Sequence, residues 1–259
     1  MQLLLIAIFI LAAGGIGSLI SGNNAGLSTR IGYISSIAGS TIGFFAAAVC
    51  FLTGDTDALS LAWHVPAGSF SVGIDPLSSF FLLPVFFLSA IAAIYGIEYM
   101  RSYQGKKSPG SHWFFYNLLT AGMAMVLIAR NGVLFLIAWE IMSLAPFFLV
   151  TYDDEKQSAR SAGWTYLVAA HLGALPLLVL FVLLAQPSGS MDFSTFSPAL
   201  ISPAMAGSVI KKRSLRANEN VSRSRSMSPS TAWRESVGST ATAMATPNTP
   251  IGRWIRRMA

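Results

Sequence analysis

Six long apolar segments constrain the fold of this chain more than any other feature of its sequence. A hydrocarbon core of ~30 Å is crossed by about 20 apolar residues of helix. The segments that meet or approach this length are 3–21, 31–52, 77–98, 112–129, 132–151 and 163–185. Hydrophobic residues make up 53% of the chain and charged residues only 11%, against roughly 25% charged in a soluble domain. The sequence therefore predicts an all-α integral membrane protein with about six transmembrane helices.

The distribution of charge divides the chain into three parts. Residues 1–210 contain seven Lys or Arg against nine Asp or Glu, whereas residues 211–259 contain ten against two. We therefore predict a helical bundle over 1–187, a Ser/Pro-rich linker over 188–210 and a basic, disordered tail over 211–259. The tail has the composition expected after a shift of reading frame. An Arg-rich tract can bind nucleic acid or anionic lipid, but a solvated tail with no nucleic-acid partner is the simpler interpretation.

Basic residues in the short loops predict the orientation of the bundle, because Lys and Arg gather on the inner side of a membrane. If the N-terminus lies outside, the outer loops contain only Arg130. The inner loops then contain Arg30, Arg101, Lys106, Lys107, Lys156 and Arg160. No basic residue precedes the first apolar segment, unlike in a secretory signal peptide. The expectation is a multi-pass protein with its N-terminus outside and a retained first helix, with an unusual cleaved signal as the alternative to the latter.

Local signals predict how several helices begin and pack. Arg130-Asn131-Gly132 separates the fourth and fifth segments, which makes them an antiparallel hairpin with a glycine at the turn. Asp75-Pro76 is typical of a helix start, with Asp as the cap and Pro as the first helical residue. Small residues recur every fourth position in the second segment, at Ser35, Gly39, Gly43 and Ala47. Such a ridge lets another helix approach closely.

Aromatic residues near the segment ends are expected to form a belt at the membrane surface. They are Trp113, Tyr116, Tyr152, Trp164 and Tyr166.

Neither a metal site nor a cofactor site is indicated. Cys50 is the single cysteine, so an intrachain disulfide and a Cys-based zinc or iron–sulfur site are excluded. His64, His112 and His171 are far apart in the sequence and lack the spacing of metal ligands. We expect no catalytic or redox centre in this chain. If the protein serves a redox process, the redox centres belong to a partner.

Glu140 is the one charge in the apolar run VLFLIAWEIMSLAPFFLV. An ionised carboxylate at that depth costs at least ~2.5–3.5 kcal/mol, and such residues usually mark an ion or proton path. Ser143 lies about one turn further along and can offer a hydroxyl on the same face. Pro146 leaves the carbonyl of Met142 without its helical donor. This polarity favours a proton relay at Glu140, and the alternative is a protonated or hydrogen-bonded residue that holds helices together.

Two further groups are weaker candidates for the same path. His171 lies in the sixth segment and can pass a proton or hydrogen-bond a neighbouring helix. The run Asp153–Lys156 follows the fifth segment. It is typical of a solvated loop, with proton collection at an entrance as the alternative.

Two stretches resemble a known family. NLLTAGMAMVLIARNGVLFLIAWEIMSLAPFFLV (117–150) and SVGIDPLSSFFLLPVFFLSAIAAIYGIEYM (71–100) are similar to the antiporter-like membrane subunits of complex I, Mrp-type antiporters, hydrogenase-4 and formate hydrogenlyase. WEIMSLAPFFLV resembles the hydrogenase-4 component B and formate hydrogenlyase subunit 3 branch in particular. The resemblance covers roughly residues 1–190.

The resemblance implies a role for Glu140 as the family's proton-moving glutamate on the fifth helix, which works with a lysine on the seventh. The family fold has about fourteen helices in two inverted repeats, so this chain looks truncated after its sixth helix. The implied function is that of a membrane subunit, or its remnant, in a proton-translocating oxidoreductase complex of the bacterial inner membrane. Its implied partners are other membrane subunits and peripheral redox subunits. The alternative is a structural membrane scaffold without transport.

Overall fold

Six long helices make up most of the computed structural model of this chain, which describes residues 1–61, 63, 68–101, 103, 107–186 and 188–196. The helices are α1 (Gln2–Ile20), α2 (Ala25–Thr53), α3 (Pro76–Arg101), α4 (Pro109–Ile128), α5 (Gly132–Val150) and α6 (Gln157–Ala185). Each is long and apolar enough to cross a membrane. The predicted all-α membrane fold is confirmed, although α2 and α6 begin six residues earlier than expected. Residues 197–259, which include the predicted tail, lie outside the described residues.

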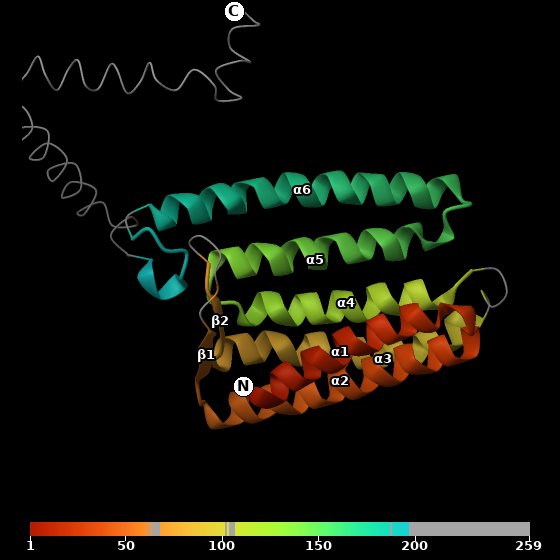
Figure 1. The fold of residues 1–259 in the computed structure, drawn as a ribbon, viewed down its shortest axis with the longest axis horizontal. Helices are drawn as coiled ribbons and strands as arrows, with labels where there is room; N and C mark the ends of the chain where they lie inside the picture. The colour runs from red at the N-terminus through yellow and green to blue at the C-terminus, as the bar shows by residue number, and fades with distance from the viewer. Residues whose placement is uncertain (62, 64–67, 102, 104–106, 187, 197–259) are drawn as a thin grey trace, which may run out of the picture. The chain divides into compact units, whose positions relative to one another are not determined.

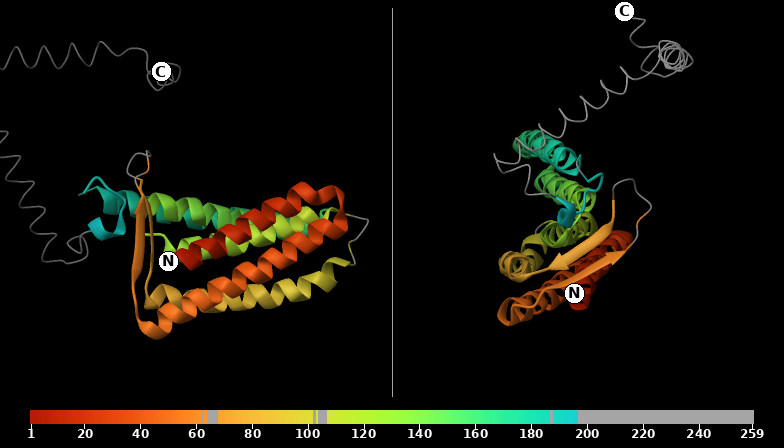
Figure 2. Two further views of the ribbon diagram at one scale, coloured as in Figure 1. Left: turned by 60° about the horizontal axis from the view of Figure 1, so that its bottom comes forward. Right: turned by 90° about the vertical axis from the view of Figure 1, so that its left-hand side faces the viewer.

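The helices form a packed group of four and an added pair. Helix α2 contacts α1, α3 and α4, and α4 also contacts α1 and α3. Helix α5 packs on α4, and α6 packs on α5 at the edge of the bundle (Figures 1 and 2). Of the six helices, α6 is the least buried. The bundle therefore has a closed side, α1–α4, and an open side at α6.

A two-stranded hairpin, which the sequence analysis missed, covers one end of the bundle. Strands β1 (Asp57–Leu61) and β2 (Phe70–Ile74) are antiparallel, with Asp57 opposite Ile74 and Leu61 opposite Phe70. We call this the hairpin end, and the end with the α1–α2, α3–α4 and α5–α6 connections the loop end (Figure 2). Short 3-10 turns lie at Ser21–Asn23 (η1), Thr151–Asp153 (η2) and Phe193–Thr195 (η3). The hairpin was missed because it is short and half exposed.

The predicted turn between α4 and α5 is confirmed, but its glycine has a different role. The Asn131 side chain caps α5 by accepting hydrogen bonds from the backbone N–H groups of Val133 and Leu134, at 2.9 and 3.4 Å. Gly132 is the first residue of α5 and does not have a positive φ. A Cβ at this position would lie 3.2 Å from the ring of Phe181 in α6. Gly132 therefore serves close packing.

The predicted ridge of small residues on α2 is buried, as expected for helix packing. A Cβ on Gly39 would lie 2.7 Å from Leu11 of α1, and one on Gly43 would lie 2.5 Å from the Phe86 ring of α3. Because real Cβ atoms do not approach this closely, these neighbours fit only against glycine. The ridge holds α2 between α1 and α3.

One member of the expected aromatic belt faces the interior of the bundle. Trp113 is fully buried, and its side chain lies against Gly32 of α2, whose added Cβ would be 2.3 Å from the Trp113 Cβ. Trp164, in contrast, is 64% exposed. The belt prediction is wrong for Trp113 because a glycine on the neighbouring helix opens a space for the indole.

An ion pair connects α3 to the α4–α5 turn at the hairpin end. Asp75 caps α3 as predicted, accepting from the Ser78 N–H at 2.7 Å. Its other carboxylate oxygen accepts from Arg130 Nη2 at 2.7 Å. Burial alone would raise the pKa of Asp75, but the hydrogen bonds from Ser78 and the Arg130 charge lower it below its ordinary value. The same turn bonds to β2, because the Arg130 N–H donates to the Ser71 carbonyl at 2.8 Å.

Residues 188–196, predicted as the start of a linker, pack on the helices. The backbone N–H of Gly132 donates to the Met191 carbonyl at 2.8 Å. The rings of Phe181 and Phe193 stack with centroids 5.6 Å apart. This segment ties the hairpin ends of α5 and α6 together.

Candidate functional site

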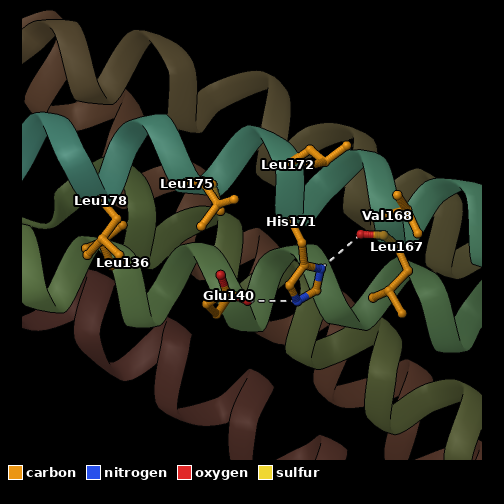
Figure 3. Close-up of a pocket in the computed structure, with 9 residues that line it drawn as sticks. Leu136, Glu140, Leu167, Val168, His171, Leu172, Leu175 and Leu178 are labelled. Carbon is orange, nitrogen blue, oxygen red and sulfur yellow. Dashed lines mark hydrogen bonds and ion pairs between the residues drawn. The ribbon is translucent and has the colours of Figure 1, made fainter. Parts of the chain in front are cut away.

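Glu140 of α5 and His171 of α6 point toward each other across the groove between these helices (Figure 3). Their side chains approach to 3.6 Å, measured from Glu140 Oε2 to His171 Nε2. This separation is longer than a hydrogen bond but within the range of an ion pair. Glu140, the main candidate from the sequence, and His171, a weaker one 31 residues later, therefore form one site.

The second ring nitrogen of His171 is held by its own helix. His171 Nδ1 lies 2.9 Å from the backbone carbonyl oxygen of Leu167, one turn earlier in α6. Since a carbonyl oxygen can only accept a hydrogen bond, Nδ1 carries a proton in this arrangement. Nε2 is left to face Glu140. The contact fixes the orientation of the imidazole ring and determines which nitrogen meets the carboxylate.

The remainder of the site is a leucine-lined cavity of about 560 Å³. Its other lining residues are Leu136, Leu167, Val168, Leu172, Ala174, Leu175 and Leu178. The side chains of Glu140 and His171 remain 43% and 47% exposed, and the described part of the chain places no further helix over this groove (Figure 1). The pair thus lies on the open side of the bundle, with apolar side chains around it.

Ser143, the third candidate, is buried and bonds to the backbone. Its hydroxyl donates to the Glu140 carbonyl oxygen at 3.1 Å. The side chain is 5% exposed, whereas Glu140 is open to the groove. The hydroxyl therefore acts on α5 itself, close to Pro146, which has no N–H to donate.

The acidic run at the loop end is tied into ion pairs. The Lys107 ammonium contacts the Asp154 carboxylate and donates to the Tyr152 carbonyl oxygen at 2.7 Å. Lys156 pairs with Asp153 at 2.7 Å. The hydrogen bond and charge of Lys107 hold the pKa of Asp154 below its ordinary value. These contacts join the α3–α4 and α5–α6 connections. The run lies in a loop, as predicted, and its ion pairs are a link that the sequence analysis did not predict.

Sequence reasoning missed two contributors to the site. Leu167 orients His171 through a backbone atom, which its side-chain type does not reveal. The leucines of α6 line the cavity, but the sequence shows them only as part of an apolar run. The sequence did contain one signal for the contact between Leu167 and His171: the two residues are four positions apart, which places them one helical turn from each other.

Two family profiles match this chain. The profile described as NADH:quinone oxidoreductase/Mrp antiporter, TM, matches residues 129–231. The profile described as NADH-Ubiquinone oxidoreductase (complex I), chain 5 N-terminus, matches residues 64–115. The first match includes both α5 and α6 and runs past Ala185 into the undescribed residues. The origin of residues 211–259 in another reading frame stays a prediction.

Curated relatives and solved structures point the same way. The chain is 31% identical over 183 residues to hydrogenase-4 component B of Escherichia coli (strain K12), covering 71% of this chain and 27% of that protein. It is 35% identical over 175 residues to a probable inorganic carbon transporter subunit of Halothiobacillus neapolitanus, covering 66% and 30%. The chain thus spans less than a third of the length of these relatives.

Among solved structures, the fold matches the Mrp complex from Dietzia sp. DQ12-45-1b with a TM-score of 0.60 and 21% identity, over 78% of this chain and 22% of that one. It also matches a membrane-bound sulfane sulfur reductase, an archaeal respiratory membrane complex, with a TM-score of 0.59 and 23% identity. That match covers 73% of this chain and 28% of the other. Together, the six-helix fold, the two profile matches and these relatives establish that the chain belongs to the family of antiporter-like membrane subunits.

Proposed function

We propose that this chain is a membrane subunit, or part of one, in a proton-translocating assembly of the hydrogenase-4, formate hydrogenlyase or complex I type. Glu140 and His171 carry the proton, and Ser143 supports α5 between Glu140 and Pro146. The observation behind this proposal is the approach of Glu140 Oε2 to His171 Nε2 in a leucine-lined cavity. The pair joins two groups that can each bind a proton, from two different helices.

The pair holds one exchangeable proton. Because Leu167 accepts from Nδ1, only Nε2 and the carboxylate remain to share it. With the proton on Glu140, both groups are neutral; with the proton on Nε2, a carboxylate faces an imidazolium. Both states have zero net charge, which avoids the cost of a lone charge among apolar side chains. If the pair gains or loses a proton, it acquires a net charge. Proton transfer to or from the pair therefore depends on polar or charged groups that approach it from outside and stabilise that charge.

The open groove provides the place for those groups. Glu140 and His171 are almost half exposed, on a face that the described residues leave uncovered. Further helices of a longer chain, or neighbouring membrane subunits, would cover this face and connect the pair to water. Electron transfer belongs to peripheral redox subunits in this scheme, with no cofactor in this chain.

The proposed location is the bacterial inner membrane, with the N-terminus outside. The loop end contains the basic residues Arg30, Arg101, Lys107, Lys156 and Arg160, and the hairpin end contains Arg130 with Asp55, Asp57 and Asp75. By the distribution of Lys and Arg, the loop end faces the cytoplasm.

The test is proton uptake by membrane vesicles that contain the chain in its host assembly. Glu140→Gln removes the carboxylate with little change of size, and we expect it to abolish uptake while assembly is retained. Glu98→Gln is the matched control, because Glu98 is an exposed glutamate on α3 that pairs with Arg101 of the same helix. Its uptake should equal that of the unchanged protein.

Two further variants, one single and one double, distinguish a role of Glu140 and His171 in proton transfer from a role in helix packing. His171→Gln should also stop uptake, and Glu140→Gln combined with His171→Gln should do so without loss of assembly. If the assembly level falls in Glu140→Gln while uptake per assembled complex is unchanged, the chain is a structural scaffold and the relay proposal is wrong.

A further inference from the structure

The junction of α2, α3 and α4 contains a second polar region, on the closed side of the bundle and away from Glu140. The buried polar side chains of these three helices include five that are all less than 9% exposed: Ser36, Ser40, Ser89, Asn117 and Thr120. The proposed proton pair does not involve these residues. Inside a membrane helix bundle such polar groups require hydrogen-bond partners.

Four of these side chains are connected by hydrogen bonds. Ser36 Oγ lies 2.9 Å from the Gly32 carbonyl oxygen and 3.0 Å from Asn117 Oδ1. The Asn117 amide donates to the Trp113 carbonyl oxygen at 2.9 Å. Thr120 Oγ1 lies 3.3 Å from Ser89 Oγ. The polar groups of α2 and α4 are therefore joined, and α4 is joined to α3.

Ser40 has no such partner. It lies one turn beyond Ser36 on the same face of α2, with an exposed fraction of 0%, yet its Oγ makes no hydrogen bond within the described residues. The Trp113 indole N–H, one turn before Asn117 on α4, is likewise buried without an acceptor there. A buried hydroxyl without a partner costs about as much as a lost hydrogen bond, so native proteins usually supply an ordered water.

We propose that the α2–α3–α4 junction binds internal water, and that a water molecule hydrogen-bonds to Ser40 Oγ. A buried water needs two to four polar partners. Ser36 lies one turn from Ser40 on the same face of α2 and its hydroxyl bonds to Asn117 of α4, so hydroxyl and amide groups of two helices lie near this position. The site would give the interior of the closed side a hydrated polar centre, separate from the cavity at Glu140.

The sign of one stability change tests this proposal. If water bonds to Ser40, then Ser40→Ala removes a made hydrogen bond and lowers the unfolding midpoint of the full chain in lipid nanodiscs, by about 2–4 °C. If the hydroxyl is dry, the same change removes an unsatisfied polar group, and the midpoint rises or stays the same. A rise or an unchanged midpoint overturns the proposal.

Ser36→Ala is the control, because Ser36 has partners in the protein and its loss lowers the midpoint whether or not water is present. A second measurement is direct: a high-resolution cryo-EM map of the host assembly should show density within hydrogen-bonding distance of Ser40 Oγ. That density should vanish in Ser40→Ala. A lowered midpoint without density at Ser40 assigns the effect to packing and also overturns the water site.

Discussion

The closed side of the bundle, α1–α4, and the open pair α5–α6 differ in the kind of polar side chain that they contain and in how far those side chains are buried. In α1–α4, small hydroxyl and amide side chains are buried between helices that approach closely at glycines. In α5–α6, besides the buried hydroxyl of Ser143, two large ionisable side chains lie in a half-open groove lined by leucine. The contrast separates a closely packed region from a groove that the described residues leave open, and in the proposed function this groove receives the groups that exchange protons with the pair.

The largest expected effect breaks the close packing of the first region. Gly32→Ala places a Cβ 2.3 Å from the Trp113 Cβ, and because neither backbone can move freely, overpacking should cost about 1–3 kcal/mol. The matched change in the open region is Gly173→Ala in α6, where nothing lies within 4 Å of an added Cβ. Thermal unfolding in nanodiscs should show a clear loss for Gly32→Ala only. Equal losses at both positions would remove the distinction between the two regions.

A smaller effect is expected at the ion pair between α3 and the α4–α5 turn, which joins the two regions. The pKa of Asp75 is lowered in the folded protein, so its contribution is complete above the unfolded pKa of about 3.9. That contribution is lost as the pH falls through the folded value. Both side chains are about a third exposed, so the pair is worth about 1 kcal/mol at most.

The variant for this test is Asp75→Asn, which keeps an oxygen to cap α3 but removes the charge. Between about pH 6 and pH 3, the unfolding midpoint of the unchanged protein should fall more than that of Asp75→Asn. Parallel curves for the two proteins would mean that the Arg130 contact adds no stability.

The smallest effect is expected at Ser143, within the open pair. Because its hydroxyl bonds to the Glu140 backbone and not to the groove, Ser143→Ala should change stability by less than about 1 kcal/mol. Proton uptake should remain, in contrast to Glu140→Gln. Complete loss of uptake in Ser143→Ala at a normal assembly level would make the hydroxyl a direct part of the relay.

The elements of this fold were largely predictable, because length and hydropathy define helices that cross a membrane. The same was true of the Asp75 cap, the turn at Arg130–Gly132 and the small-residue ridge on α2, each of which has a local chemical cause. The hairpin β1–β2 was not predictable, since its strands are short and gain stability from the helix ends that they cover.

The sequence by itself determined the number of helices and the presence of one acid, Glu140, in the middle of the fifth. Only the tertiary structure decided that His171 faces this acid. The physical reason is that α5 and α6 are apolar on nearly every side, so their hydropathy does not indicate which face meets which neighbour. Rotation of either helix by part of a turn would have separated the two groups, and the packing of side chains between the helices fixes that rotation.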